Sequence, residues 1–138
     1  MEVRSTELRD ELVHLAFDSD ETLVAVARTF EHTIGYGDTD REIVALASVC
    51  SHPQHRSKGY GDAVVHAAFR RVDDAQVPAL FQTPVPGFYD RLACRVINNQ
   101  ITTSKPGVRA FDDAWAMIYP DTALWDHHAA IDLRAAGW

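Results

Sequence analysis

The stretch SHPQHRSKGYGDAVVHAAFRR, Ser51 to Arg71, decides the fold of this chain. Its first half is a polar, basic loop that carries Gly59 and Gly61 with one residue between them. From Asp62 to Gln76, apolar and polar side chains recur at helical spacing on two different faces. This period predicts an amphipathic helix that begins directly after the glycines.

The segments on either side of this stretch predict buried strands. Glu42–Cys50 is apolar nearly throughout, which is typical of a central strand covered on both faces. Val77-Pro78 ends the helix, and Ala79–Thr83 predicts the next strand. A strand, a glycine loop and a helix in this order form an anion site, because the first-turn N–H groups lack intrahelical partners. Taken alone, the glycine pair also fits a simple solvated turn.

Weaker patterns complete the chain. Glu11–Phe17 fits a strand or a helix end, Thr22–Phe30 favours a strand, and Gly35 and Gly37 mark a loop. Later segments predict two neighbouring antiparallel strands, Arg95–Thr103 and Ala114–Pro120, before an irregular tail, Asp121–Trp138. The alternation of strands and helices indicates an α/β protein with a mixed sheet.

The loop resembles the pyrophosphate-binding signature of the GNAT superfamily of acyl-CoA-dependent N-acetyltransferases. Arg56-Ser57-Lys58-Gly59-Tyr60-Gly61 matches the pattern [RQ]-x-x-G-x-[GA], and Pro53 precedes it as in many members. Further along, GFYDRLACRV looks like that family's F-Y-x-x-x-G-F segment, with Ala93-Cys94 in place of its glycine and phenylalanine. The resemblance runs from about Leu12 to the end of the chain.

The resemblance implies a single GNAT-like domain over residues 1–138. Its fold would be a mixed, mostly antiparallel central sheet flanked by helices, with shortened N-terminal elements. Acetyl-CoA would lie where the strands Glu42–Cys50 and Ala79–Thr83 splay apart. The resemblance places the pantetheine arm on the backbone of Val49, Cys50 and Ser51. It places the pyrophosphate on the backbone of Arg56, Ser57, Lys58, Gly59, Tyr60 and Gly61.

The catalytic residue that the resemblance implies is Tyr89. The thiolate of CoA needs a proton when it leaves the thioester, and a phenol near the sulfur can donate it. A tyrosine that only packs is the alternative, and Phe88 is most simply core. The amine-deprotonating base is not assigned, and Glu31 and Glu42 are possible.

Histidines give no metal site in this sequence. His52 and His55 adjoin the loop and are expected to face solvent or the phosphates. His127-His128 could suggest ligands, but adjacent histidines usually point apart, so no metal is predicted.

The tail IDLRAAGW is similar to the C-terminus of aminoglycoside 2'-N-acetyltransferases. By this analogy Asp132 and the carboxylate of Trp138 would bind a cationic substrate. A tryptophan that merely anchors the tail is the slightly favoured alternative. Those enzymes carry a carboxylate where this chain has Ala47, which argues against an aminoglycoside acceptor.

The N-terminus and the composition carry further expectations. Only about ten residues precede Leu12, so Leu12, Leu15 and Phe17 would face water unless a homodimer covered them. A net charge of -7 argues against a nucleic-acid partner. No signal peptide or membrane-spanning run is seen, which predicts a cytoplasmic protein with Cys50 and Cys94 as buried free thiols.

Three functions remain open at this point. The leading one is acetyl transfer from acetyl-CoA to a primary amine of a small molecule, by direct attack in a ternary complex. The second is a non-catalytic acyl-CoA-binding module, and the third is a protein N-acetyltransferase.

Overall fold

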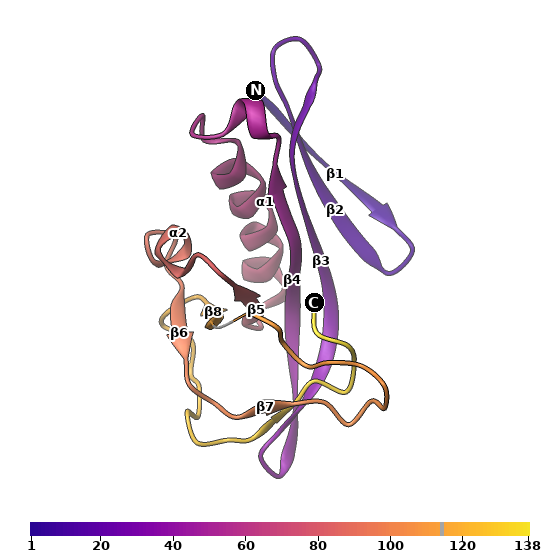
Figure 1. Ribbon diagram of the computed structural model, residues 1–138, viewed down its shortest axis with the longest axis vertical. Coiled ribbons are helices and arrows are strands. Elements are labelled where there is room, and N and C mark those ends of the chain that lie inside the picture. Colours follow the sequence, from indigo (N-terminus) through magenta and orange to yellow (C-terminus); the bar gives the residue numbers. More distant parts are fainter. Residues whose placement is uncertain (114) are drawn as a thin grey trace. The chain divides into compact units, whose positions relative to one another are not determined.

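The computed structural model describes residues 1–113 and 115–138. It divides into two compact units, which are described separately below. The first unit comprises Met1–Glu31 and Leu46–Gln76, and the second comprises His32–Ala45 and Val77–Trp138. Strands β3 (Leu23–Tyr36) and β4 (Thr39–Ser51) each contribute one part to either unit (Figure 1). The single domain over the whole chain stays a prediction.

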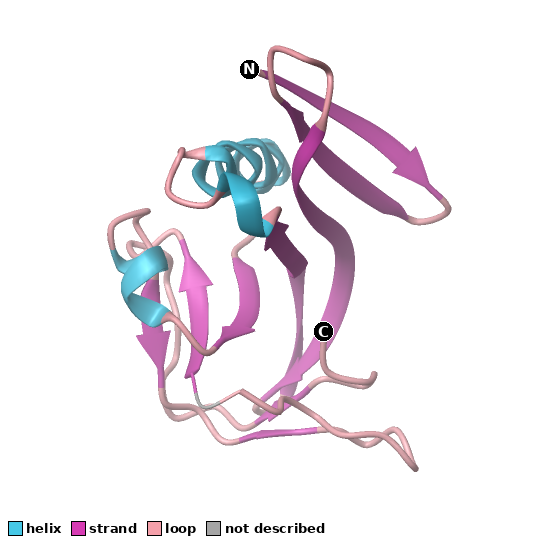
Figure 2. Ribbon diagram, turned by 45° about the horizontal axis from the view of Figure 1, so that its top comes forward, coloured by secondary structure: helices cyan, strands magenta, loops and turns pink. Residues whose placement is uncertain are grey.

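The first unit is a sheet covered by one long helix. Strands β1 (Glu2–Leu8), β2 (Glu11–Phe17) and β3 pair antiparallel in chain order, and β4 lies next to β3. Helix α1 (Tyr60–Ala75) contacts β1 and β2 (Figure 2). Its buried side chains are Val64, Val65, Ala67, Ala68, Phe69 and Val72. The predicted helix is confirmed, and it begins two residues earlier than expected.

A strand precedes Leu12, contrary to the sequence-based expectation. β1 pairs with β2 along its whole length, from Glu2 opposite Phe17 to Leu8 opposite Glu11. Leu12, Leu15 and Phe17 are therefore half-buried rather than fully exposed. The reason is geometric: a charged decapeptide can still supply an edge strand, because backbone pairing needs few apolar side chains. An exposed apolar patch at these residues therefore no longer supports a homodimer, and the homodimer stays a prediction.

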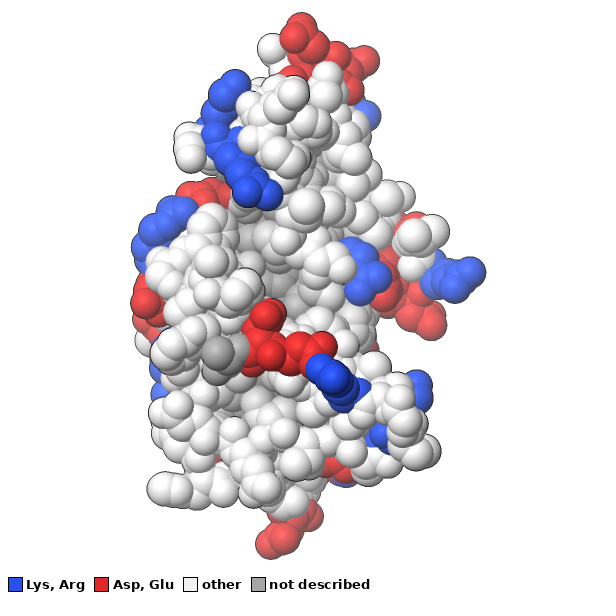
Figure 3. Space-filling model, viewed as in Figure 1, with Lys and Arg blue, Asp and Glu red and all other residues white. Residues whose placement is uncertain are grey.

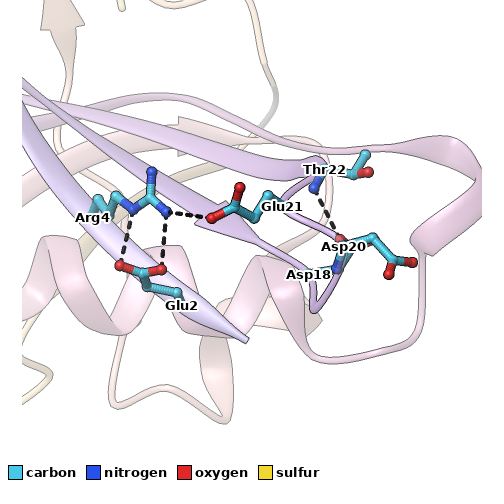
Figure 4. Close-up of polar contacts among 6 residues, drawn as sticks. All are labelled: Glu2, Arg4, Asp18, Asp20, Glu21 and Thr22. Carbon is cyan, nitrogen blue, oxygen red and sulfur yellow. Dashed lines mark hydrogen bonds and ion pairs between the residues drawn. The ribbon is translucent and has the colours of Figure 1, made fainter.

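Polar contacts fix the connections of the N-terminal strands (Figure 4). A turn follows β2, and one carboxylate oxygen of Asp18 accepts the N–H groups of Asp20 at 2.9 Å and Thr22 at 3.0 Å. These two bonds lower the pKa of Asp18. On β1, the guanidinium of Arg4 pairs with Glu2 at 2.9 Å. Both contacts are solvent-exposed, so they set local geometry more than stability.

The second unit is a mixed sheet with a short helix. Its path runs β3, β4, β5 (Ala79–Thr83), β8 (Trp115–Tyr119) and β6 (Arg95–Ile97). Two short strands, β7 (Ile101–Thr102) and β9 (Ile131–Asp132), pair with each other, and β9 also pairs with β3. Helix α2 (Pro86–Asp90) follows β5. The β4–β5 pair is parallel, with Val44 opposite Ala79 and Ala45 opposite Leu80.

Three sequence-based boundaries are wrong in this unit. The predicted loop around Gly35 and Gly37 is a tight hairpin: β3 runs through Gly35 to Tyr36, and the turn consists of Gly37, with φ +59°, and Asp38. Gly35 lies close to β9, where an added Cβ would come within 3.2 Å of the Cβ of Asp132. Close approach rather than a turn explains this glycine.

The other two boundaries fail because Asn99 and the tail bind each other. The predicted strand Arg95–Thr103 is interrupted between β6 and β7. There the amide of Asn99 donates to the carbonyls of Asp126 and Ala129, both at 2.8 Å, and accepts from the indole of Trp125 at 2.9 Å. The tail beyond Asp121 is not wholly irregular, since it contains β9. The predicted strand Ala114–Pro120 is confirmed as β8, with Ala114 outside the described residues.

The predicted fold class is confirmed. Five consecutive residues of β4, Ile43 to Ala47, are buried, as their unbroken apolar run predicted. Most strand pairs are antiparallel, and β6 and β8 are antiparallel neighbours as expected. In the described residues, no helix has the length and apolarity needed to cross a bilayer.

Candidate functional site

The candidate anion loop connects β4 to α1 within the first unit. His52 donates its backbone N–H to the carbonyl of Val24 at 2.7 Å, which ties the start of the loop to β3. The imidazole of His52 then accepts the N–H of Gln54 at 3.1 Å, at the start of a single 3-10 turn, Pro53–His55. Proline suits this first position because its missing N–H is not needed there. The loop therefore begins from a fixed point.

Two left-handed residues bend the loop into the helix. Ser57 has φ +66° and Gly59 has φ +81°. Gly59 is the N-cap of α1, and no side chain caps the helix there. A Cβ built on Gly59 would meet no heavy atom within 4 Å, so the space beside its backbone is open. The first-turn N–H groups thus lie at an uncapped, positive helix end that a phosphate can approach.

The side chains of the loop add positive charge around this helix end. Arg56, Ser57 and Lys58 are exposed, whereas Tyr60 and Gly61 are half-buried. Basic side chains gather over the region of this loop in Figure 3. The resulting field attracts an anion even though the chain carries a net charge of -7.

The two loop histidines form an aromatic row with Tyr60. The rings of His52 and His55 lie 5.1 Å apart, and those of His55 and Tyr60 lie 5.9 Å apart. His52 is exposed as expected, and His55 is half-buried. This row connects the start of the loop to the first turn of α1. In residues 1–113 and 115–138, no three histidine, cysteine or acidic side chains meet as metal ligands would.

The end of β4 contains a feature that the sequence did not reveal. Ser48 has φ +55°, an unusual value for a non-glycine residue inside a strand. It kinks β4 immediately before Val49, Cys50 and Ser51, the residues predicted to bind a pantetheine arm. Strained backbone of this kind is common at binding sites. Serine has no special preference for this conformation, so no sequence signal could have located the kink.

The two cysteines differ, which corrects the expectation that both are buried. Cys50 is exposed near the end of β4, and Cys94 is buried after α2. The prediction failed for Cys50 because it lies beyond the buried run of β4, which ends at Ala47. Burial raises the pKa of the Cys94 thiol to about 12, with smaller contributions from two nearby carboxylates.

Tyr89 belongs to the second unit and lies on α2. It is 5% exposed and packs against Phe81 at 4.7 Å and Phe88 at 4.9 Å between ring centroids. Burial, together with the neighbouring Cys94, raises the pKa of the phenol well above its ordinary value. The phenol therefore keeps its proton at neutral pH, as a proton donor must. Phe88 is half-buried, so it contributes to the core less than expected.

The turn after α2 contains a left-handed residue where the resembling family has glycine. Ala93 has φ +61°, directly before the buried Cys94. The carbonyl of Tyr89 accepts the N–H groups of Leu92 at 2.9 Å and Cys94 at 3.3 Å around this turn. Ala93 thus holds a conformation that glycine adopts more easily.

Asp132 and Trp138 hold the tail of the second unit in place. A carboxylate oxygen of Asp132 accepts the N–H groups of Ser104 at 2.8 Å and Arg134 at 2.9 Å, and these bonds lower its pKa. The indole of Trp138 donates to the carbonyl of Leu80 at 2.8 Å. Both contacts fit an anchoring role, and a role in substrate binding stays a prediction for both residues.

The side chain of Gln82 connects three segments of the second unit, a role that the sequence did not predict. Its amide donates to the backbone oxygen of Trp138 at 2.8 Å and accepts the N–H groups of Asp112 at 2.8 Å and Asp113 at 2.7 Å. One side chain of β5 thereby joins the tail to the segment before β8. An isolated glutamine in an apolar strand was the only signal available.

The structure does not single out either of the two candidate general bases. Glu31 and Glu42 are both exposed. Of the histidine pair in the tail, the imidazole nitrogen Nε2 of His127 lies 2.8 Å from the guanidinium of Arg95, so it accepts a hydrogen bond there. The general base stays unassigned.

Comparison with known proteins gives one family and one fold. The family model described as "Acetyltransferase (GNAT) domain" matches residues 1–97. Comparison with curated protein sequences gives no significant match.

Several solved structures share the fold at low sequence identity. The Escherichia coli GNAT family N-acetyltransferase YhbS, solved with CoA, is 13% identical with a TM-score of 0.64, over 89% of this chain and 67% of that one. Bacillus subtilis YlbP, also solved with coenzyme A, is 17% identical with a TM-score of 0.51, over 78% and 66%. A GCN5-related N-acetyltransferase from Kribbella flavida is 20% identical with a TM-score of 0.53, over 63% and 22%. This chain thus covers about two thirds or less of the length of each of these three structures.

Proposed function

Because this chain belongs to the GNAT acetyltransferase family, we propose that it transfers an acetyl group from acetyl-CoA to a primary amine of a small molecule. The observation that carries the proposal is the open helix end at Gly59, bordered by the exposed Arg56 and Lys58. That two solved relatives of the same fold were obtained with CoA supports the same donor.

Acetyl-CoA supplies a thioester, and the residues of this chain bind it and handle protons. The backbone N–H groups from Arg56 to Gly61 bind the pyrophosphate, and Arg56 and Lys58 screen its charge. The backbone of Val49, Cys50 and Ser51 hydrogen-bonds the pantetheine arm as a neighbouring strand would. The pantetheine arm carries amide groups, and these can pair with the unpaired N–H and C=O groups of an open strand edge.

The transfer itself is a direct attack in a ternary complex. The neutral amine nitrogen attacks the thioester carbonyl carbon, a C–N bond forms, and the C–S bond breaks. Tyr89 gives its phenolic proton to the departing sulfur, and the extra proton of the amine leaves to a base or to water. A primary amine is the simplest acceptor because it offers both a lone pair and a proton to lose.

A screen of amines tests this function. Purified protein is incubated with acetyl-CoA and panels of small polyamines, amino sugars, amino acids and N-terminal peptides, and free CoA thiol is detected. We expect release that depends on one class of small amine. Release only with peptides would favour the protein N-acetyltransferase. CoA binding by calorimetry without release with any amine would favour the non-catalytic module.

A further inference from the structure

A chain of polar side chains, centred on the buried His14 and Thr29, connects β1, β2, β3 and α1 in the first unit, apart from the candidate anion loop. His14 of β2 is 2% exposed, yet both ring nitrogens have partners. Its Nδ1 lies 2.8 Å from the hydroxyl of Ser5 on β1, and its Nε2 lies 3.0 Å from the hydroxyl of Thr29 on β3. Arg71 of α1 donates from one nitrogen to both the hydroxyl and the carbonyl of Thr29, each at 2.7 Å.

The geometry assigns a direction to each hydrogen bond. Arg71 can only donate, so the hydroxyl oxygen of Thr29 accepts from it. Because Thr29 is fully buried, its hydroxyl proton also needs an acceptor, and in the described residues Nε2 of His14 is in position to accept it. In the neutral ring the other nitrogen must carry the proton, so Nδ1–H donates to Ser5. The imidazole is therefore neutral, with its proton on Nδ1.

Protonation of the ring would break this order. An imidazolium donates from both nitrogens, so the hydroxyl oxygen of Thr29 would have to accept from two cations, and its own proton would lose the acceptor that Nε2 provides. The charged groups that act on His14 are the cations Arg71 and Arg70 of α1, while β1 and β3 offer it the neutral hydroxyls of Ser5 and Thr29. The buried site thus favours the neutral ring on both grounds, desolvation and repulsion.

We propose that Ser5, His14, Thr29 and Arg71 form an acid-sensitive latch that fastens the β1–β2 hairpin to the sheet and to α1. The hairpin is suited to local opening because β1 is an edge strand whose residues are exposed except for a half-buried Val3. The latch is independent of the proposed acetyltransferase function. It stabilises the closed hairpin while His14 is neutral and weakens it when His14 takes up a proton.

The pH range follows from linkage. The pKa of His14 is lowered from 6.5 to about 4 in the closed structure, first by burial and then by the two arginines. An opened hairpin exposes the ring to water and restores a pKa near 6.5. The open state therefore binds more protons, and closure is strongest above pH 6.5. As the pH falls from there toward 4, opening becomes about ten-fold easier per unit, roughly two orders of magnitude in all.

Nuclear magnetic resonance of the intact protein tests the latch in two ways. At pH 7, imidazole ¹⁵N shifts should show His14 protonated on Nδ1 only. Amide exchange of β1 and β2, corrected for intrinsic rates, should show opening that increases ten-fold per unit below pH 6.5, while the slowest amides of α1 report global unfolding. An Nε2–H tautomer, or hairpin opening independent of pH, would overturn the proposal.

Three variants separate the latch from general acid sensitivity. His14→Gln should remove the pH dependence of hairpin opening. Thr29→Val keeps the shape of the side chain, and it should increase opening at pH 7 and abolish the Nδ1–H preference. His66→Gln, at an exposed histidine of α1, is the matched control and should behave as the parent protein. If His14→Gln fails to fold, the Thr29→Val and tautomer results still decide, and an unchanged tautomer in Thr29→Val would contradict the latch.

Discussion

The loop before α1 and the segment around α2 are built in opposite ways. The loop of the first unit is exposed, carries basic side chains and leaves its helix end without a capping side chain. The segment of the second unit buries Tyr89 and Cys94 and raises the pKa of both. Binding a large anion needs open backbone, whereas exclusion from water disfavours the charged forms of a phenol and a thiol and so raises their pKa. The contrast teaches that an anion-binding loop and a neutral, proton-bearing side chain place opposite demands on the chain.

The largest effect is expected for a substitution in the exposed loop before α1. Gly59→Asp adds a side chain at φ +81° and a negative charge beside the helix end. CoA binding should be lost, with at least about a hundred-fold weaker affinity, because the carboxylate repels the pyrophosphate and the new side chain occupies the open space beside the helix end. Thermal shift and calorimetry with CoA measure the loss.

A control separates strain from the loss of the site. Gly107→Asp introduces the same residue at another left-handed glycine, with φ +76° and no heavy atom within 4 Å of the added Cβ. It should keep CoA affinity. Equal stabilisation of the Gly59→Asp and parent proteins by CoA would show that the pyrophosphate does not bind at this loop.

The second effect concerns the buried region. Tyr89→Phe preserves the ring packing and removes the phenolic proton. The kcat should fall by about 10²–10⁴-fold, the usual contribution of a general acid, while the CoA dissociation constant stays nearly the same. Because the pKa of Tyr89 is raised, loss of its proton should not limit kcat of the parent enzyme near neutral pH. An unchanged kcat with a good acceptor would reduce Tyr89 to a packing residue.

The third effect compares the two thiols directly. Cys50 is exposed, while burial raises the pKa of Cys94 to about 12. Since the thiolate is the reactive form, a disulfide reagent at pH 7.5 should label Cys50 on the order of a hundred-fold faster than Cys94. Bound CoA should slow the labelling of Cys50. Cys50→Ser provides the control, and equally fast labelling of both thiols would contradict the contrast.

The smallest effect tests the turn after Tyr89. Ala93→Gly relieves a left-handed alanine at φ +61° and restores the residue of the resembling family. The free energy of unfolding should rise by about 0.5–1 kcal/mol, because glycine has no Cβ and adopts a positive φ without steric strain. Denaturant titration measures the change. Ala110→Gly, at a half-buried alanine with no positive φ, is expected to destabilise instead, and a loss of stability in Ala93→Gly would show that the turn is not strained.

The sequence determined the elements whose signals are local. The apolar run of β4, the helical period of α1 and the glycine pattern between them depend only on nearby residues, and all three were found at the predicted places. The pattern at Arg56–Gly61 and the segment around Tyr89 also indicated the family that the comparison confirms. These features can be predicted from sequence because backbone geometry and periodic burial restrict which residue types each position accepts.

Only the tertiary structure decided the features that join distant segments. β1 forms because β2 offers it a free edge, although its own residues are mostly polar. Ser48 is kinked, Gln82 joins three segments, and His14 is buried next to a cation, yet none of these residues is unusual for its neighbours in sequence. The environments of His14 and Gln82 arise from contacts between residues 9 to 56 positions apart. Such contacts depend on packing, and packing is fixed only once the strands and helices have met.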